Sequence, residues 1–430
     1  MIHREREGSE MKRKWKSMMV AISLVLVMLV SMAGCSYGVQ GENLMDHIES
    51  NEVTGVQNLT VDNVTITDFG IRLLKEEHED GNNTLLSPLS VLYALAMTAN
   101  GAKGDTKTQM EKTFGMPVDK LNDYLYSYMQ ALPQDDKYQL NLANSIWFTD
   151  DDRFTVNQDF LQCNADYYGA DIYRTPFDHT TLKDINHWVK EETHGMIPKV
   201  LDRIPQKEAL MYLINALAFE AEWADIYERG QTRDGNFTRE DGITQKVSFM
   251  YGEESNYLED EHAVGFLKYY YGHKYAFVAL LPEPGMSVSD YVATLNGQHL
   301  NDMLINREHS TVKTSIPKFE TEYSVEMSEV LKNMGMEDAF DEGEADFTAL
   351  GTSTAGNIYI TRVLHKTFIS VGEKGTRAGA VTVVEVGDKG MAMQPEEPKI
   401  VYLNRPFVYM LIDCETNIPF FVGTMMDVDS

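Results

Sequence analysis

The 430-residue chain carries 37 basic and 66 acidic residues, for a formal net charge of -29. This charge argues against nucleic acid and against heparin-like polyanions as partners, because both are densely negative. Apolar residues make up 43% of the sequence and charged residues 24%, as in globular proteins with a sizeable core, and no Pro-, Gly- or Ser-rich linker divides the chain after residue 63. We therefore expect one large domain over residues 63–430, present as a monomer.

The N-terminal part has the features of a secretory signal. A basic cluster precedes a 13-residue apolar run over 18–30, which is too short to span a bilayer comfortably. Ala33, Gly34 and Cys35 follow, and they resemble a bacterial lipoprotein processing site, at which Cys35 would become the lipid-bearing first residue. We expect residues 1–34 to be a lipoprotein-type signal peptide. The alternatives are ordinary cleavage nearby and a retained membrane helix, and a true start at Met11 would leave residues 1–10 as an extension.

The mature chain stays strongly acidic, so anionic lipid head groups would repel it and membrane attachment needs an anchor. Two acyl chains on Cys35 would supply firm attachment, whereas one chain gives only marginal binding. We expect residues 35–62 to be the lipidated cysteine and a flexible tether. The expected location is the extracellular face of the cell membrane, with secretion as the alternative.

Helix and strand signals alternate irregularly along the rest of the chain. Residues 91–100 read as a buried helix, 186–192 as an amphipathic helix, and 275–281 as a strand ended by Pro282. No internal repeat and no strand–helix–strand rhythm is found. The pattern favours a mixed α+β domain.

Close to the C-terminus lies a stretch of small residues with the period of a strand. Alternate positions give one uncharged face, while Arg377 and Glu385 fall on the other face. That uncharged face consists of Thr376, Ala378, Ala380, Thr382, Val384 and Val386. Residues 387–398 are rich in Gly, Pro and acidic residues and read as an exposed loop. A latent strand therefore runs into an exposed, cleavable loop.

This combination resembles the hinge and reactive loop of the serpins, a family of serine protease inhibitors. The matching hinge residues are Glu373, Gly375, Thr376, Ala378 and Ala380. The resemblance runs in order over about residues 63–428, and its further matches include Ser87-Pro88, Asn144 with Trp147, Asn215-Ala216, Pro317-Lys318-Phe319, His365-Lys366 and Asn404-Arg405-Pro406-Phe407. It implies a serpin fold of the α+β class, with three β-sheets, about nine helices and an exposed reactive loop.

In serpins a central sheet parts to admit the loop as an extra strand, and the hinge must be buried in that sheet for insertion. The hinge here is Glu373, Lys374, Gly375, Thr376, Arg377, Ala378, Gly379 and Ala380. Arg377 replaces the usual acid and Gly379 replaces alanine. The first lies on the outward face and the second is small, so the resemblance still implies an insertable strand.

The resemblance also places a gate in the central sheet. Its positions, called the shutter residues below, are Ser87, Ser90, Asn215 and His365. Their side chains are hydrogen-bonding groups of complementary type, and leaving one unpaired in the interior costs about 1–3 kcal/mol. Such a cluster tends to hold one of two arrangements. His365 is therefore expected to serve the opening of the sheet and not catalysis.

Two bonds compete as the site of protease attack. Counting from Glu373 by the family spacing gives Lys389 and Gly390, which would suit a trypsin-like protease. Counting back from Pro406 favours Met391 and Ala392, which would suit an elastase- or chymotrypsin-like pocket. The expected partners are therefore serine proteases of these three kinds.

An enzyme would need a recognisable nucleophile with its base, or a metal cluster. The sequence has no Gly-x-Ser-x-Gly elbow, His-Glu-x-x-His helix or Walker loop. The acidic runs at 150–152 and 338–346 lack calcium-loop spacing, so we expect neither a metal ion nor a cofactor. The leading hypothesis is a suicide-substrate inhibitor of serine endopeptidases. The alternative is a non-inhibitory surface lipoprotein that uses the serpin fold for binding.

Overall fold

The computed structural model describes residues 38–133, 135, 137–203, 210–354, 356–376 and 397–428. The expected signal peptide (1–34), the lipidation site Cys35, the hinge residues 377–380 and the reactive-bond candidates at 389–392 lie outside the described residues. From Gln40 onward the described chain forms one compact unit.

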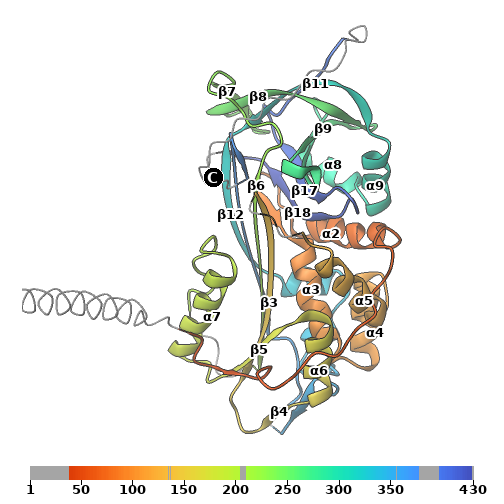
Figure 1. The fold of residues 1–430 in the computed structure, drawn as a ribbon, viewed down its shortest axis with the longest axis vertical. Coiled ribbons are helices and arrows are strands. Elements are labelled where there is room, and N and C mark those ends of the chain that lie inside the picture. Colours follow the sequence, from red (N-terminus) through yellow and green to blue (C-terminus); the bar gives the residue numbers. More distant parts are fainter. Residues whose placement is uncertain are drawn as a thin grey trace, which may run out of the picture. The chain divides into compact units, whose positions relative to one another are not determined.

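The main sheet is a seven-stranded sheet that runs along the molecule (Figure 1). Its strands, in spatial order, are β1 (Glu42–Asn43), β5 (Asp171–Thr175), β3 (Tyr138–Thr149), β6 (Met211–Glu222), β15 (Gly375–Thr376), β14 (Arg362–Gly372) and β12 (Phe319–Glu326). The central strand β6 is buried on both faces over most of its length, which explains its nearly continuous apolar sequence.

The second sheet has nine strands. Its path is β16 (Lys399–Tyr402), β11 (Glu308–Pro317), β8 (Thr244–Glu259), β9 (Ala263–Tyr269), β10 (Tyr275–Pro282), β17 (Phe407–Asp413), β18 (Pro419–Met425) and β2 (Thr84–Leu86), with β7 (Thr232–Thr238) paired to β8. A small third sheet joins β4 (Phe154–Val156) to β13 (Gly351–Ser353). The described strands thus form three sheets, which confirms the expected number.

Nine α-helices lie in the described part of the chain, as expected. They are α2 (Asn63–Glu77), α3 (Pro88–Ala99), α4 (Gly104–Phe114), α5 (Val118–Gln130), α6 (Gln158–Tyr168), α7 (His179–Glu192), α8 (Val288–Thr294), α9 (Gly297–Ile305) and α10 (Ser328–Asn333), with short 3₁₀ turns η1 (Tyr271–His273) and η2 (Asp338–Phe340). Helix α7 lies on one face of the main sheet, and α3 and α5 lie on the other (Figure 1). None of the described helices is long and apolar enough to cross a membrane.

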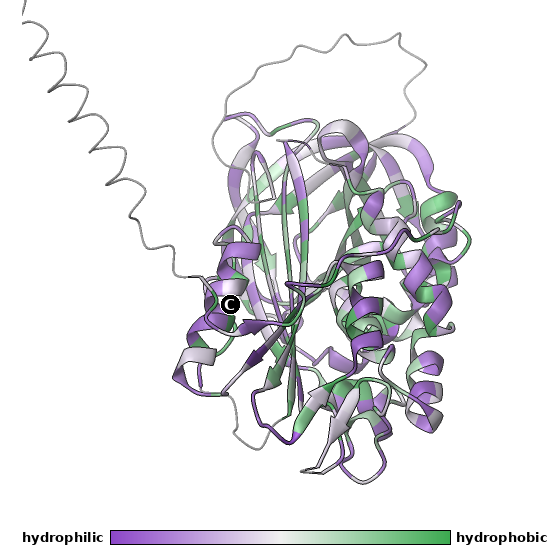
Figure 2. Cartoon of the chain, turned by 60° about the horizontal axis from the view of Figure 1, so that its bottom comes forward, coloured by the Kyte–Doolittle hydropathy of each residue, from purple (hydrophilic) through white to green (hydrophobic). Residues whose placement is uncertain are grey.

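Helix α3 is buried at every position because it packs between the main sheet and β18 of the second sheet. It begins earlier than the predicted residue 91, since Ser87 caps it and Pro88 occupies its first turn. Helix α7 likewise begins at His179, where Asp178 and Thr181 form a reciprocal cap, and not at 186. Hydrophobic colour follows the inner strands, and the outward sides of the helices are largely hydrophilic (Figure 2). Helix α3 therefore packs directly against β3 and β6, the inner strands of the main sheet.

Residues 40–62 differ from the flexible tether expected for this region, and we call them the N-terminal arm. Strand β1 pairs with β5, and the Leu44 amide donates to the Ile172 carbonyl at 2.8 Å. The amides of Gln40 and Gly41 donate to Asp184 Oδ2 of α7 at 2.9 and 3.0 Å. Five apolar residues of the arm pack against the core, namely Leu44, Met45, Ile48, Val56 and Leu59. They are spaced too irregularly to signal a helix or strand, so their packing was not visible in the sequence.

Replacing Asp184 should loosen the start of the arm. In Asp184→Ala both arm amides lose a charged acceptor, and a hydrogen bond to a charged group contributes about 1.5–3 kcal/mol. We expect hydrogen exchange at Gln40 and Gly41 to become about ten- to a hundredfold faster. Lys183→Ala, an exposed neighbour in the same helix, is the matched control. Equal exchange at the two amides in both variants would contradict the assigned role of Asp184.

Candidate functional site

Two residues of the hinge are part of the main sheet. Gly375 and Thr376 form β15, with Thr376 opposite Ala221 of β6 on one side and Val371 of β14 on the other. The Thr376 side chain is only 1% exposed, and its hydroxyl lies 2.5 Å from that of Tyr270. Two hinge residues, Gly375 and Thr376, therefore already lie as a short strand between β6 and β14. The sequence predicted which face of the hinge could be buried, but not that Gly375 and Thr376 are already buried in the sheet in this state.

Gly375 is required by the close approach of β15 to β6. Its φ of 151° lies in a region that favours glycine. A Cβ atom at this position would lie 1.9 Å from the Ala221 carbonyl oxygen. A larger residue would therefore displace the hinge from the sheet.

Beyond β15, the two strands that flank it pair with each other directly. The parallel register between β6 and β14 runs from Tyr212 opposite Arg362 to Leu217 opposite Thr367. A longer inserted strand needs this space, because a strand between β6 and β14 must take over the hydrogen bonds of both. Extension of β15 along the sheet is thus coupled to separation of β6 from β14.

The four shutter residues come together at this closed part of the sheet. Ser87 N–H donates to His365 Nε2 at 3.0 Å, and His365 Nδ1 lies 2.5 Å from Asn215 Oδ1. The Ser90 hydroxyl donates to the same Asn215 oxygen at 3.2 Å, and the Ser90 amide donates to Ser87 Oγ at 3.3 Å. Asn215 and His365 are directly opposed in the β6–β14 register. Separating these two strands must therefore break the bond between them.

The partners of His365 fix its protonation state. Nε2 accepts from a backbone amide, so the ring proton is on Nδ1 and is donated to Asn215. Burial lowers the pKa of His365 to about 3. A protonated ring would also direct a second N–H at the Ser87 amide. The closed cluster is therefore built around a neutral imidazole.

Asn144 extends this cluster by one strand, and the shutter residues named from the sequence did not include it. It is opposed to Asn215 in the antiparallel register between β3 and β6, so both side chains lie on the same face. Asn144 Oδ1 and Asn215 Nδ2 are buried without a described partner. One is an acceptor and the other a donor, on residues that are directly opposed across the two strands. Asn144, Asn215 and His365 are aligned across β3, β6 and β14, and this alignment depends on the strand register, which the sequence alone does not supply.

The turn that leads into β15 is held by the segment after β6. Trp223 N–H donates to the Lys374 carbonyl at 2.8 Å, and Tyr227 N–H donates to the Glu373 carbonyl at 2.9 Å. The Trp223 indole donates to the Gly372 carbonyl at 2.8 Å. At the surface, Lys318 Nζ lies 2.9 Å from Glu373 Oε1. Three hydrogen bonds and one ion pair therefore anchor the hinge turn.

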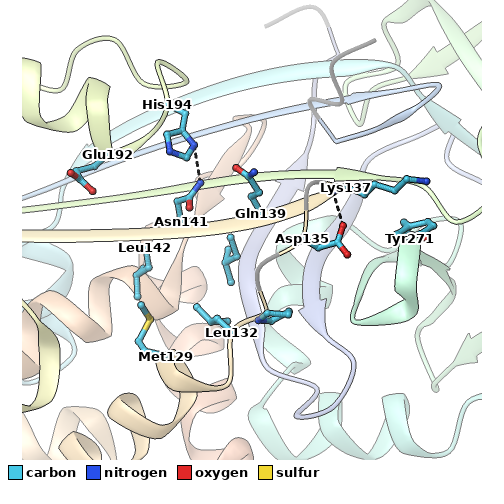
Figure 3. A pocket seen from close by; sticks show the side chains of 12 residues that line it. Met129, Leu132, Asp135, Lys137, Gln139, Asn141, Leu142, Glu192, His194 and Tyr271 are labelled. Carbon is cyan, nitrogen blue, oxygen red and sulfur yellow. Dashed lines mark hydrogen bonds between the residues drawn. The ribbon is translucent and has the colours of Figure 1, made fainter. Parts of the chain in front are cut away.

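A cavity of about 920 Å³ lies beside the first residues of β3, near the end of α7 (Figure 3). Two of its lining side chains, His194 and Asn141, are hydrogen-bonded to each other, with Nδ1 of His194 3.2 Å from Nδ2 of Asn141. Its lining residues are Met129, Leu132, Pro133, Asp135, Lys137, Gln139, Leu140, Asn141, Leu142, Glu192, His194 and Tyr271. This described lining includes no serine, threonine or cysteine, so it offers none of the usual hydroxyl or thiol nucleophiles.

The fold defines a protein whose main sheet is closed along its middle and already holds the start of an additional strand. A family model described as serpin (serine protease inhibitor) matches residues 64–428. The chain belongs to the serpin family. As a serpin it is not an enzyme, in agreement with the expectation from its sequence.

Individual relatives agree with this assignment. An uncharacterized serpin-like protein of Thermococcus kodakarensis is 29% identical over 369 residues, covering 84% of each chain. The leukocyte elastase inhibitor of Xenopus laevis is 30% identical over 376 residues, covering 83% of this chain and 97% of the relative. The chain is thus homologous to serpins that are named as inhibitors.

Solved structures place the chain near thermophilic serpins. The native state of the thermophilic serpin tengpin matches with a TM-score of 0.85 and 48% identity, over 90% of this chain and 100% of that chain. Its latent state gives a TM-score of 0.76 at 47% identity, over 89% and 100% of the two chains. The present fold is therefore more similar to the native form than to the latent form of that protein. The expected serpin fold is confirmed.

The buried His365 should make stability depend on pH. Its pKa is about 3 in the folded protein and about 6.5 when exposed, so the unfolded chain takes up the proton first as pH falls. The stabilisation is complete above about pH 6.5 and is lost progressively towards pH 3. Urea unfolding should show a contribution of up to about 1.4 kcal/mol per pH unit between pH 6 and 4.

His365→Gln should remove this contribution, because the amide cannot titrate in that range. His309→Gln, at an exposed position of β11, is the matched control for loss of an imidazole. The difference in slope between wild type and His365→Gln isolates the shutter histidine from the carboxylates. Identical slopes in the two proteins would show that His365 is protonated equally in the folded and unfolded states.

Proposed function

We propose that this serpin inhibits serine endopeptidases as a suicide substrate. The observation that carries the proposal is the burial of Thr376 in a short strand between β6 and β14. Further along the same two strands, β6 and β14 pair with each other directly, and the shutter residues lie at this pairing. Homology to a leukocyte elastase inhibitor supports it. The small uncharged face of the following hinge residues supports it as well.

The chemistry begins in the protease. The oxygen of its active serine bonds to the carbonyl carbon of the scissile residue, the peptide C–N bond breaks, and the serine proton passes to the leaving amine. The cut end of the loop is then joined to the protease by an ester and is released from the C-terminal part of the inhibitor. The residues that follow Thr376 in the sequence then insert between β6 and β14, and the ester-linked protease moves with them.

The distance travelled is large. About 13 residues separate Thr376 from Lys389, and at about 3.3 Å per residue they form a strand of about 43 Å. Such a displacement is comparable to the diameter of a protease, so the enzyme would be pulled against the end of the inhibitor. Distortion of its oxyanion hole would then block hydrolysis of the ester. Insertion must be faster than hydrolysis for trapping to succeed.

Two reactive bonds remain in the proposal. Cleavage after Lys389 would direct the inhibitor at trypsin-like proteases, because their specificity pocket binds a cationic side chain. Cleavage after Met391 would direct it at elastase- or chymotrypsin-like proteases, whose pockets accept apolar side chains. Asp388 before Lys389 suits few trypsin-like enzymes, which weighs against the first bond.

Incubation of residues 36–430 with a protease of each kind should give a complex that survives denaturing electrophoresis. Thr376→Arg should abolish the complex while the loop is still cut, because a guanidinium cannot replace a side chain that is 1% exposed inside the sheet. Lys374→Ala is the matched control, because Lys374 bonds to Trp223 through its backbone carbonyl and alanine keeps that carbonyl. An unchanged complex yield in Thr376→Arg would exclude strand insertion.

Mass spectrometry of the released C-terminal fragment identifies the bond, because the fragment begins at Gly390 or at Ala392. Cleavage without any complex from wild type would contradict the inhibitory proposal. The function would then be that of a non-inhibitory surface protein that binds its partners through the serpin fold.

For localisation, we propose a lipid anchor on Cys35 at the outer face of the cell membrane. The support is the basic cluster, the short apolar run and the Ala33-Gly34-Cys35 triplet that precede the arm. Labelled fatty acid should enter the wild-type protein in a bacterial host and not Cys35→Ser, which should be released from the membrane fraction. Equal labelling of the two proteins would exclude Cys35 as the acceptor.

A further inference from the structure

A buried ammonium group lies beside the segment that holds the hinge turn. Lys268 of β9 is 3% exposed, and its Nζ lies 2.8 Å from Glu254 Oε1 of β8. The same nitrogen donates to the Asp225 carbonyl at 3.1 Å. It also lies 4.6 Å from the ring centre of Tyr227 and 5.3 Å from that of Trp223. One cation thus contacts three positions of the segment 223–227.

The location of this ion pair calls for a physical reason. Removing two charges from water costs more than their attraction returns unless the geometry is very good, so apolar residues of similar size would commonly stabilise the fold as well. The carboxylate of Glu254 is itself mostly buried. A buried cation, however, fixes the directions of a carboxylate, a carbonyl and two aromatic rings at once. The pair therefore provides positional precision more than stability.

What the cation fixes is the set of groups that bind the hinge. Trp223 and Tyr227 supply the hydrogen bonds to the carbonyls of residues 372–374. The Trp223 ring also stacks on Tyr270, with ring centres 4.3 Å apart and planes inclined by 12°. Tyr270 in turn shares a hydrogen bond with the Thr376 hydroxyl. A continuous set of contacts therefore leads from Lys268 to the first inserted side chain.

We infer that Lys268, paired with Glu254, is a positioning residue that keeps the hinge turn docked and Thr376 inside the sheet. Without the cation, Trp223 and Tyr227 would sample other orientations and the turn would leave its site more often. After cleavage the strand would then start its entry from a less ordered position. The docking of the hinge turn is a property of the uncleaved protein and does not depend on the proposed inhibitory function. Only the effect of Lys268 on protease trapping rests on that function.

The direct test is hydrogen exchange in the full chain. The amides of Trp223 and Tyr227 are bonded to the hinge turn, so they report its docking. In Lys268→Met we expect their exchange to become at least about tenfold faster. Lys313→Met, at an exposed position of the neighbouring strand β11, is the matched control and should exchange as wild type does. Amides of β10 serve as the internal reference for global stability.

A second variant separates positioning from stability. Lys268→Met alone leaves a buried acid without its cation, whereas the double variant Lys268→Met with Glu254→Gln removes both charges. We expect the double variant to unfold at a urea concentration close to wild type and still to show the faster exchange at Trp223 and Tyr227. If the single variant does not fold, the double variant decides the question. Wild-type exchange at both amides in the double variant would overturn the inference.

The effect on trapping is measured with any protease that forms a complex. The fraction of inhibitor that ends in complex, relative to the fraction that is cut and released, should fall about fivefold in the double variant. An unchanged fraction, with faster exchange, would overturn the link between hinge docking and trapping. If wild type forms no complex with any protease, the inhibitory function fails while the exchange result still decides whether Lys268 positions the hinge.

Discussion

The direct pairing of β6 with β14 is the constraint on which the rest of the structure depends. It places Asn215 opposite His365, and the shutter hydrogen bonds hold the two strands together at that point. One end of the same pair of strands is already open and holds Gly375 and Thr376. In the middle of the main sheet β6 and β14 are hydrogen-bonded to each other, whereas at one end both are hydrogen-bonded to β15.

The groups at both regions are buried and polar, namely the shutter residues in the middle and the Tyr270 and Thr376 hydroxyls at the end. A buried polar group without a partner is costly, so intermediate separations of β6 and β14 are unfavourable. The neutral ring of His365 accepts from Ser87 in α3 and donates to Asn215 in β6. Because α3 is buried between two sheets, the state of the main sheet is tied to the packing of the helix behind it.

Much of the site could be predicted from the sequence. Period-2 alternation identified the small face to which Thr376 belongs, and the resemblance to serpins identified the shutter residues that the structure brings together. The residues that were missed depend on distant strands. Asn144 acquires its neighbour only through the β3–β6 register, and Lys268 meets Trp223 only where β9 passes the end of β6. The docking of the arm was missed because its apolar residues follow no period.

The two edges of the main sheet are protected against pairing with strands of neighbouring molecules. At one edge β1 of the arm covers part of β5. At the other edge β12 carries outward-facing Glu320 and Glu322. Covered and charged edges disfavour pairing with another chain, which is the first step of aggregation. Among the described strands, then, pairing with another chain is disfavoured at both margins of this sheet, whereas its interior already holds a short strand, β15, from its own chain.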